Sequence, residues 1–254
     1  MTLDIESGTG LFRDKTVLLL DMNSTFMFGE DRFGQNEDYS LRYRCLGGAL
    51  PNSDINRIVR DAYCYLDARY PDERYRHAFP SLETAIREVA GAALEARELV
   101  KVVDAFAWHE IGHIPETYAR VLHALAECFT LAAVIDIWSP KRLWLREFER
   151  AGISELFSAM SFSSDHGIVK PSPRPFERLL DQLGVVPSEA LVVGDSVRRD
   201  LGGARRAGID CVLVGGAQHP DALGSFRNLI ELSKVLRRVG RSAREPAFPP
   251  RQRG

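Results

Sequence analysis

Long apolar runs, paired cysteines and a strong excess of charge are all missing from this sequence of 254 residues. No apolar run approaches the roughly 18 residues of a membrane-spanning helix, so we expect no membrane partner. The formal net charge is -2, which gives the chain as a whole no electrostatic attraction to nucleic acid. The four cysteines form no Cys-x-x-Cys pair, and the start, MTLDIESGTG, lacks signal-peptide features. A reduced, cytoplasmic compartment is the expectation that follows.

The positive charge that is present gathers at the C-terminal end. Seven of the 33 Lys and Arg residues lie from Lys234 onward, together with one acidic residue, Glu245, and three prolines. A segment of this kind either binds a polyanion or is a solvated end without fixed structure. We favour the second interpretation and expect residues 241–254 to be a disordered basic tail.

Short apolar runs and amphipathic stretches alternate in the second half of the chain. Strands are predicted for the apolar runs at 129–136, 157–163, 190–195 and 209–216, and for the run at 16–20 near the start. Helices are predicted for the stretches between them, at 140–152, 173–184 and 198–208, each of which ends in glycine. Repeated units of this length predict an α/β fold, a Rossmann-like parallel sheet with helices on both faces.

Residues from about 36 to 112 have a different pattern. Their apolar residues recur at helical spacing, and no convincing strand stands out among them. Pro115 then marks the expected start of another helix. We therefore predict a helical domain at residues 29–112, inserted into a core domain formed by residues 1–28 and 113–240.

Carboxylates follow three of the predicted strands. Asp21, Asp136 and Asp195 each stand directly after an apolar run, and Asp200 comes five residues after Asp195. In parallel sheets the carboxyl ends of the strands meet at one edge, where ligands bind. Converging carboxylates repel one another, and Mg²⁺, which prefers oxygen ligands, is the usual remedy. Lys170 lies just ahead of another predicted helix and supplies a cation that can balance a phosphate or a nucleophile.

These motifs resemble those of the haloacid-dehalogenase-like (HAD) superfamily over roughly residues 16–216. The first motif of that family is an apolar strand followed by Asp-x-Asp-x-Thr/Val, and here the strand is followed by DMNST at 21–25. The third motif is a lysine that often precedes proline, here Lys170-Pro171. The fourth is an apolar strand, Gly-Asp, a second acid and a Gly-Ala-rich helix, here VVGDSVRRDLGGA at 192–204.

The resemblance implies a role for each matching position. Asp21 is expected to be the nucleophile and a metal ligand, with Asp195 and Asp200 completing the metal site and Asn23 contributing its backbone carbonyl. Lys170 is expected to hold the phosphoryl group and Asp21. The implied cofactor is Mg²⁺, and the implied substrate is a small phosphorylated molecule. The helical insert is similar to the cap domain that closes over the active site in this family.

The phosphate-binding positions match the family less well. The resemblance implies phosphate contacts from Thr25 and Lys170, and a further one from a Ser or Thr at the end of the next strand. That slot aligns with Ile135 or Asp136, and neither side chain suits a phosphate, because isoleucine has no donor and aspartate repels the anion. We expect Ser139 to substitute if the loop after the strand bends back.

Asn23 is the second position at which the sequence departs from the family's motifs. Hydrolytic members of the family place a general acid/base there, which protonates the leaving oxygen and then deprotonates water, and an amide does neither. The leading hypothesis is a Mg²⁺-dependent HAD-type phosphatase with a weakened acid/base step. The alternatives are a HAD-fold protein that binds a phosphorylated ligand without turnover, and a dehalogenase, whose relatives also lack the second acid and work without metal. Metal dependence discriminates among these hypotheses.

A second motif in the sequence suggests a different kind of metal site, one for zinc. His109, Glu110 and His113 match the His-Glu-x-x-His pattern of zinc proteases, in which two histidines on one helical face bind the metal. Pro115 follows too closely for the helix to continue, and no third ligand is evident. We favour a surface or linker segment over a zinc site.

Overall fold

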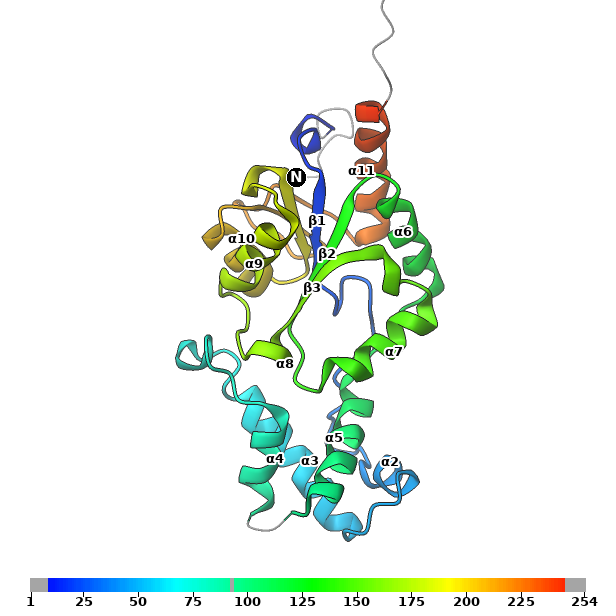
Figure 1. Cartoon of the computed structure of the whole chain (residues 1–254), viewed down its shortest axis with the longest axis vertical. Helices are drawn as coiled ribbons and strands as arrows, with labels where there is room; N and C mark the ends of the chain where they lie inside the picture. The colour runs from blue at the N-terminus through cyan, green and yellow to red at the C-terminus, as the bar shows by residue number, and fades with distance from the viewer. Residues whose placement is uncertain (1–8, 92–93, 245–254) are drawn as a thin grey trace, which may run out of the picture.

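The computed structural model describes residues 9–91 and 94–244, and its centre is a six-stranded parallel sheet (Figure 1). The strand order is β3-β2-β1-β4-β5-β6, so β1 lies between β2 and β4. The strands are β1 (Val17–Leu20), β2 (Thr130–Ile135), β3 (Phe157–Phe162), β4 (Ala190–Gly194), β5 (Asp210–Leu213) and β6 (Gly224–Ser225). The first five confirm the predicted strands, whereas the two-residue β6 was not anticipated.

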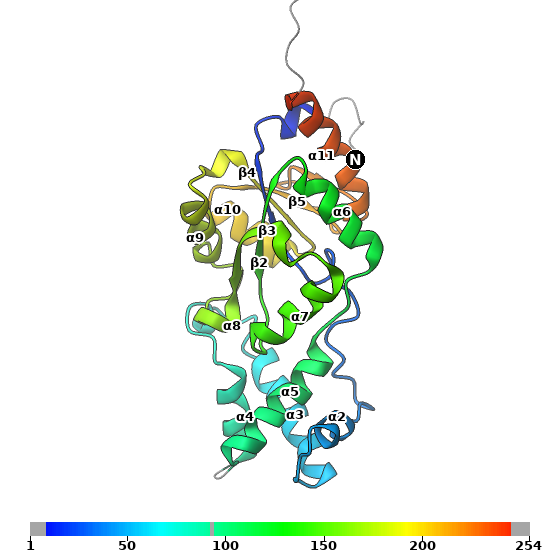
Figure 2. The same ribbon diagram turned by 45° about the vertical axis from the view of Figure 1, so that its right-hand side comes forward.

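Helices cover both faces of the sheet, which confirms the predicted fold class (Figure 2). Side chains of β1 alternate between the two cores, with Leu18 and Leu20 in one and Val17 and Leu19 in the other. One face carries α6 (Glu116–Ala126), α7 (Lys141–Ala151) and α11 (Leu229–Arg244), and the other carries α9 (Arg174–Leu183) and α10 (Gly202–Arg206). The remaining short elements are η1 (Thr9–Phe12), η3 (Ser154–Leu156), α8 (Ser163–His166), η4 (Pro187–Glu189) and the π-helical turn η5 (Val197–Leu201).

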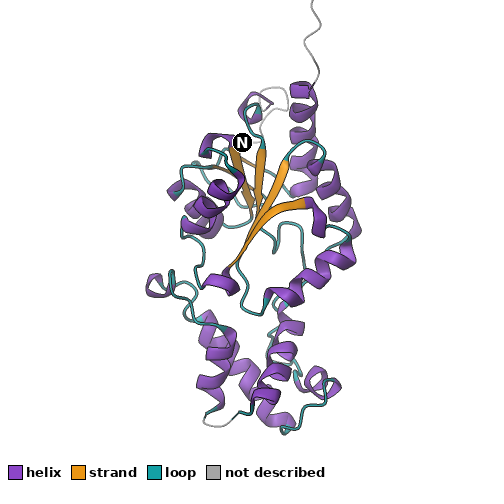
Figure 3. Cartoon of the chain, viewed as in Figure 1, coloured by secondary structure: helices purple, strands orange, loops and turns teal. Residues whose placement is uncertain are grey.

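The segment between β1 and α6 forms a separate group of helices beyond the carboxyl ends of the strands (Figure 3). It contains α2 (Ser40–Cys45), α3 (Asn52–Asp67), η2 (Glu73–Tyr75), α4 (Leu82–Ala90) and α5 (Ala96–Glu110). These helices enclose a hydrophobic cluster of their own, which includes Tyr43, Val59, Leu66 and Phe106. We call this group the helical insert. Its amphipathic spacing had predicted helices here.

The chain leaves the sheet-bearing part and returns to it at one place. Phe28 and His113 form an antiparallel bridge, with N–H···O distances of 3.0 and 2.8 Å. Gly112 allows this close approach, because a Cβ atom there would lie 2.8 Å from the Phe28 carbonyl oxygen and from the Met27 side chain. The two connections of the helical insert therefore run side by side.

The helical insert also touches the other side of the sheet edge through the segment around η2. The Phe79 N–H donates to the Gly167 carbonyl at 2.8 Å, and the Val169 N–H donates to the Arg76 carbonyl at 3.0 Å. Gly167 and Val169 lie close in sequence to Lys170, so these bonds hold the segment around η2 next to the sheet edge where the acids gather.

The C-terminal end differs from the prediction. Helix α11 continues to Arg244, so residues 241–244 are helical, while residues 245–254 of the expected basic tail lie outside the described residues. Leu229, Leu232, Leu236 and Val239 recur at helical spacing and are buried against the core. Lys234, Arg237 and Arg238 therefore occupy the polar positions of an amphipathic helix. Among the described residues, no helix has the length and apolarity that a membrane span requires.

Candidate functional site

The first site carboxylate is fixed by the end of β1. Asp21 continues the strand for one more residue, because its N–H donates to the Val193 carbonyl of β4 at 2.8 Å. A tight turn follows, in which three successive N–H groups, those of Thr25, Phe26 and Met27, converge on the Met22 carbonyl. The turn brings the Thr25 hydroxyl to 3.4 Å from Asp21 Oδ2. Asp21 and Thr25 are both buried.

The second and third carboxylates come from the end of β4. Asp195 follows the strand directly, and Asp200 lies in the π-helical turn η5, where its Oδ2 accepts the Ser196 N–H at 2.9 Å. Gly194 makes room for it, because a Cβ atom at that position would lie 2.3 Å from the Asp200 carboxyl carbon. This glycine allows the Asp200 carboxylate to lie against the end of β4, and Asp200 is almost fully buried.

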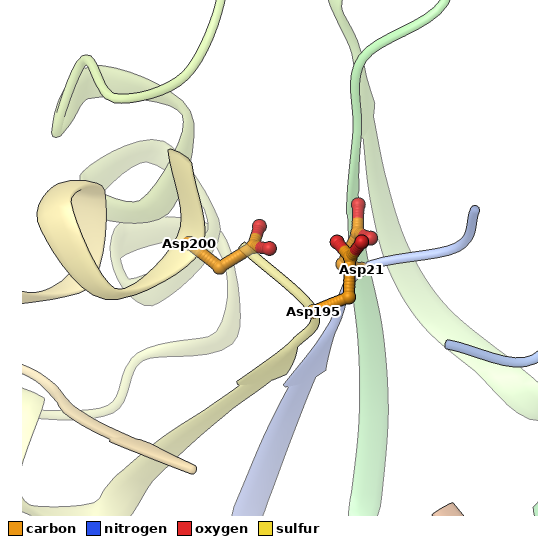
Figure 4. Close-up of side chains that lie close together, drawn as sticks. All are labelled: Asp21, Asp195 and Asp200. Atoms are coloured by element: carbon orange, nitrogen blue, oxygen red, sulfur yellow. The ribbon is translucent and has the colours of Figure 1, made fainter. Parts of the chain in front are cut away.

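Asp21 and Asp195 meet at the sheet edge, as their positions at strand ends predicted, and Asp200 joins them from η5 (Figure 4). One carboxylate oxygen of each lies within 4.8 Å of those of the other two. Lys170 lies among them, with its Nζ 2.5 Å from Asp21 Oδ1 and 2.7 Å from Asp200 Oδ1. Its side chain is only 2% exposed, so the ammonium group is removed from water and contacts two carboxylates instead.

Burial and neighbouring charges shift the pKa values of Asp21 and Lys170 in opposite directions. Burial raises the pKa of Asp21, and the neighbouring Lys170 ammonium lowers it. Burial lowers the pKa of Lys170, but the carboxylates of Asp200 and Asp21 outweigh it and raise that pKa above its usual range. Lys170 is therefore a permanent cation. Its charge opposes the burial that raises the pKa of Asp21 to about 7, and so it favours the ionised form that a nucleophile requires. Burial also raises the pKa of Asp195, with the charge of Asp200 adding to the effect.

Asn23 lies in the turn directly after Asp21. Its Oδ1 is buried and has no hydrogen-bond partner among the described residues. The backbone bonds of the turn end on the carbonyls of Met22 and Met27, so in this part of the chain no backbone donor is directed at the Asn23 carbonyl. Asn23 thus presents two oxygen atoms that remain available to a ligand.

Ser139, the expected substitute for the missing phosphate contact, and Asp136, which occupies the slot itself, are arranged differently. Ser139 is already engaged in two contacts, because its hydroxyl accepts the Trp144 indole N–H at 2.7 Å and its backbone N–H donates to Glu110 at 2.9 Å. Asp136 does lie beside the site, where its Oδ2 accepts the Lys170 backbone N–H at 2.9 Å. The geometry therefore gives no support to a phosphate contact from Ser139, and it places a carboxylate at the end of β2.

Two side chains at this edge were not singled out from the sequence. Tyr70, from the helical insert, donates its hydroxyl to Asp136 Oδ2 at 2.6 Å. Arg199 lies 3.4 Å from Asp195 Oδ1, and its guanidinium is 5.9 Å from the Tyr70 ring centroid. The pair of arginines between two acids in DSVRRD was a signal for Arg199. The sequence around Tyr70 gives no signal for its place at this edge, because its partner Asp136 is 66 residues away.

The zinc-protease pattern is not assembled. Helix α5 ends at Glu110, before His113, so the two histidines do not share a helical face. His113 is 3.2 Å from Glu147, whereas His109 is buried against the Tyr39 ring, contrary to the expected surface position. Glu110 accepts the N–H groups of Trp138 and Ser139 at 2.7 and 2.9 Å. Across residues 9–91 and 94–244, only Asp21, Asp195 and Asp200 form a cluster of three or more side chains suited to a metal.

Comparison with known proteins agrees with this geometry. Residues 17–208 match the family described as haloacid dehalogenase-like hydrolase. The phosphoserine phosphatase of Thermus thermophilus is 34% identical over 139 residues, which are 54% of this chain and 54% of that protein. The chain therefore spans about half the length of this curated relative.

Solved structures show the same fold. The 2-haloacid dehalogenase of Pseudomonas syringae pv. tomato aligns with a TM-score of 0.61 and 23% identity, covering 88% of this chain and 99% of that one. The HAD-hydrolase YfnB of Bacillus subtilis, bound to magnesium, aligns with a TM-score of 0.54 and 18% identity, covering 87% and 98%. Since the family match extends over most of the chain and its motif residues meet at one edge of the sheet, this chain belongs to the haloacid dehalogenase-like hydrolase family.

Proposed function

We propose that this protein is a Mg²⁺-dependent phosphatase that acts on small phosphorylated molecules through an aspartyl-phosphate on Asp21. The observation that carries the proposal is the position of Lys170, whose Nζ bridges Asp21 and Asp200 beside Asp195. A buried carboxylate whose ionised form is favoured by a neighbouring lysine, next to a cluster of further carboxylates, suits attack on phosphorus.

The donor atoms of this edge fit Mg²⁺. Asp21 and Asp195 offer carboxylate oxygens, Asp200 is within reach of both, and the Asn23 carbonyl is available to complete the set. Mg²⁺ binds through one or two carboxylates and keeps waters and substrate oxygens as its other ligands. When bound, the ion would neutralise the carboxylates and the negative charge of the phosphoryl group.

The protein's own groups divide the reaction into two steps. Asp21 attacks phosphorus, an aspartyl-phosphate forms, and the bond to the leaving oxygen breaks. Lys170 stays beside Asp21 and balances the charge of the transferred group. In the second step water attacks the phosphorus and releases phosphate, which returns Asp21 as a carboxylate. Asn23 has no proton to give to the leaving oxygen and does not accept one from water, so both steps lack acid/base assistance.

We propose that residues 29–112 act as a cap and select the substrate. The paired connections at Phe28 and His113 and the separate hydrophobic cluster of the helical insert support a division from the core at residues 28 and 113. The Thermus relative is named for a small phosphorylated substrate, phosphoserine, and the magnesium-bound structure of YfnB reveals interdomain movement in that protein. A cytoplasmic location remains part of this proposal, and the four free cysteines fit a reducing compartment.

The experiment is a screen of phosphorylated metabolites with wild-type protein and Asp21→Asn, each with Mg²⁺ and with EDTA. Phosphate release by wild type in Mg²⁺ alone, absent from Asp21→Asn, is the expected result. A variant at Asp210 is the matched control, because this aspartate pairs with Lys15 at the start of β5 and is no part of the cluster. Equal activity in EDTA, or activity that survives in Asp21→Asn, would contradict the proposal.

The second candidate is a binding protein that holds a phosphorylated ligand without turnover. It is favoured by Asn23 and by Asp136, whose carboxylate stands at the end of β2 where relatives place a hydroxyl donor. Ligand-induced stabilisation without phosphate release in the same screen would select it. Dehalogenation has less support, because Asp195 and Asp200 are both present and adjacent to Asp21.

A further inference from the structure

A groove of about 500 Å³ lies beside the paired connections at Phe28 and His113, between the helical insert and α7. Its walls come from α2, α5, α7 and the two paired connections, and Figures 1 and 2 both show the end of α5 next to α7. Asp21, Lys170 and Asp195 do not line it. A volume of this size is typical of sites for small organic ligands.

The groove holds guanidinium groups that form no ion pair with a described carboxylate. Arg32, Arg42 and Arg146 all line it, and none of the three forms an ion pair with another described residue. Arg32 donates only to backbone carbonyls, at Gly29, Trp108 and Ile111. Arg42 has a buried Nε without a hydrogen-bond partner among the described side chains and backbone. Arginines with free donors are the usual ligands of phosphate groups.

The acids in the walls are already engaged. Asp104 is bound by Arg142 at 3.1 Å. Glu147 is bound by Arg150 at 2.6 Å, and His113 lies 3.2 Å away from it. Because these carboxylates have partners of their own, the guanidinium groups of Arg32, Arg42 and Arg146, none of which is in an ion pair with a described residue, set the charge that an incoming ligand meets.

The groove also exposes a flat ring. The Trp108 side chain lines it and is 55% exposed, which is unusual for the largest aromatic side chain. The Arg42 guanidinium lies over this ring at 4.7 Å from its centroid. An indole and a guanidinium together form a stacking surface for a planar ligand group.

We propose that this groove binds a phosphorylated molecule that carries a flat ring, of which a nucleotide is an example. The phosphate is held by Arg42 from the helical insert and Arg146 from α7, and the ring stacks on Trp108. Because Arg42 and Arg146 belong to different parts of the chain, one bound ligand connects the helical insert to the sheet-bearing part. This site is independent of any reaction at Asp21.

The test uses adenosine monophosphate as the probe and isothermal titration calorimetry as the readout. The full chain carries Asp21→Asn and is kept in EDTA, so that turnover does not contribute to the heat. We expect saturable binding, and we expect Arg146→Ala and Arg42→Ala each to weaken it about tenfold or more. Adenosine, which lacks the phosphate, should bind at least about tenfold more weakly by the same reasoning. Trp108→Ala should also weaken the binding of adenosine monophosphate.

Arg120→Ala is the matched control, because this exposed arginine pairs with Glu116 on α6 and does not line the groove. Its affinity should equal that of the parent. Arg146 is exposed on α7, so its variant is expected to fold even if Arg42→Ala does not. Absence of saturable binding, equal affinity in Arg146→Ala, or equal affinity for adenosine would each overturn the proposal.

Discussion

Replacing Asn23 with aspartate should restore a carboxyl group where this chain has an amide. General acid/base catalysis contributes about 10²–10⁴-fold to a reaction rate. At about 1.36 kcal/mol for each factor of ten, this corresponds to roughly 3–5 kcal/mol in the activation free energy. For alkyl phosphates, whose leaving oxygen needs a proton, we expect Asn23→Asp to raise kcat/KM by about this factor.

The surroundings of Asn23 suit an acid. The side chain is half-buried, its Oδ1 lacks a partner among the described residues, and Asp21, Asp195 and Asp200 lie at the same edge. Burial and nearby negative charge raise the pKa of a carboxyl group, which favours the protonated form that a general acid requires. Aryl and acyl phosphates have better leaving groups, so the first step should gain less from the substitution.

The assay is steady-state kinetics on one alkyl and one aryl phosphate in Mg²⁺. Asn23→Ala is the control, because it removes the amide without adding an acid and should give no gain. A larger gain for the alkyl than for the aryl phosphate supports the reasoning. If Asn23→Asp binds Mg²⁺ but accelerates neither substrate, then the missing acid is not the limiting defect. The carboxylate at Asp136 would then explain low turnover better.

Three further predictions concern metal and protons. Asp195→Asn should weaken Mg²⁺ binding about tenfold or more by calorimetry, and unchanged binding, or none in wild type, would contradict the proposed site. Burial raises the pKa of Glu110 to about 7, so its contribution to stability is present below about pH 4.5 and is lost as the pH rises through 7. The free energy of unfolding of wild type relative to Glu110→Gln should fall by up to about 3 kcal/mol between pH 4.5 and 8 in chemical denaturation, and a pH-independent difference would refute this. Purified protein should contain no stoichiometric zinc by elemental analysis, and one zinc per chain that is lost in His113→Ala would reverse the dismissal of that motif.

The sequence was sufficient for the features that depend on local pattern. Strand-like runs that end in Asp21 and Asp195 are periodic signals within a few residues, and parallel pairing of β1 with β4 brings their ends together. Asp200 could be included in the predicted cluster because it stands five residues after Asp195, as the second acid of the fourth motif. The fold class and the convergence of the three aspartates were predictable for this reason.

Features that depend on distant contacts were not predictable. The bond between Tyr70 and Asp136 joins residues far apart in sequence, and no local composition indicates it. Ser139 was expected near the phosphate, but the Trp144 indole takes its hydroxyl. At the C-terminal end, residues 241–254 were expected to be a basic tail, but α11 continues through residues 241–244. The apolar residues that recur at helical spacing from Leu229 onward indicate a helix in this region.

The most direct test of the central claim is a search for phosphate on Asp21 itself. Wild-type protein is mixed with acetyl phosphate in Mg²⁺, quenched in acid, digested and analysed by mass spectrometry. Because Asn23 gives no assistance to the attack of water, we predict that the phosphorylated intermediate accumulates. The peptide that contains Asp21 should carry one phosphoryl group, and the same peptide from Asp21→Asn or from a reaction in EDTA should carry none. Phosphate release without a label on Asp21, or a label at another residue, would contradict the account.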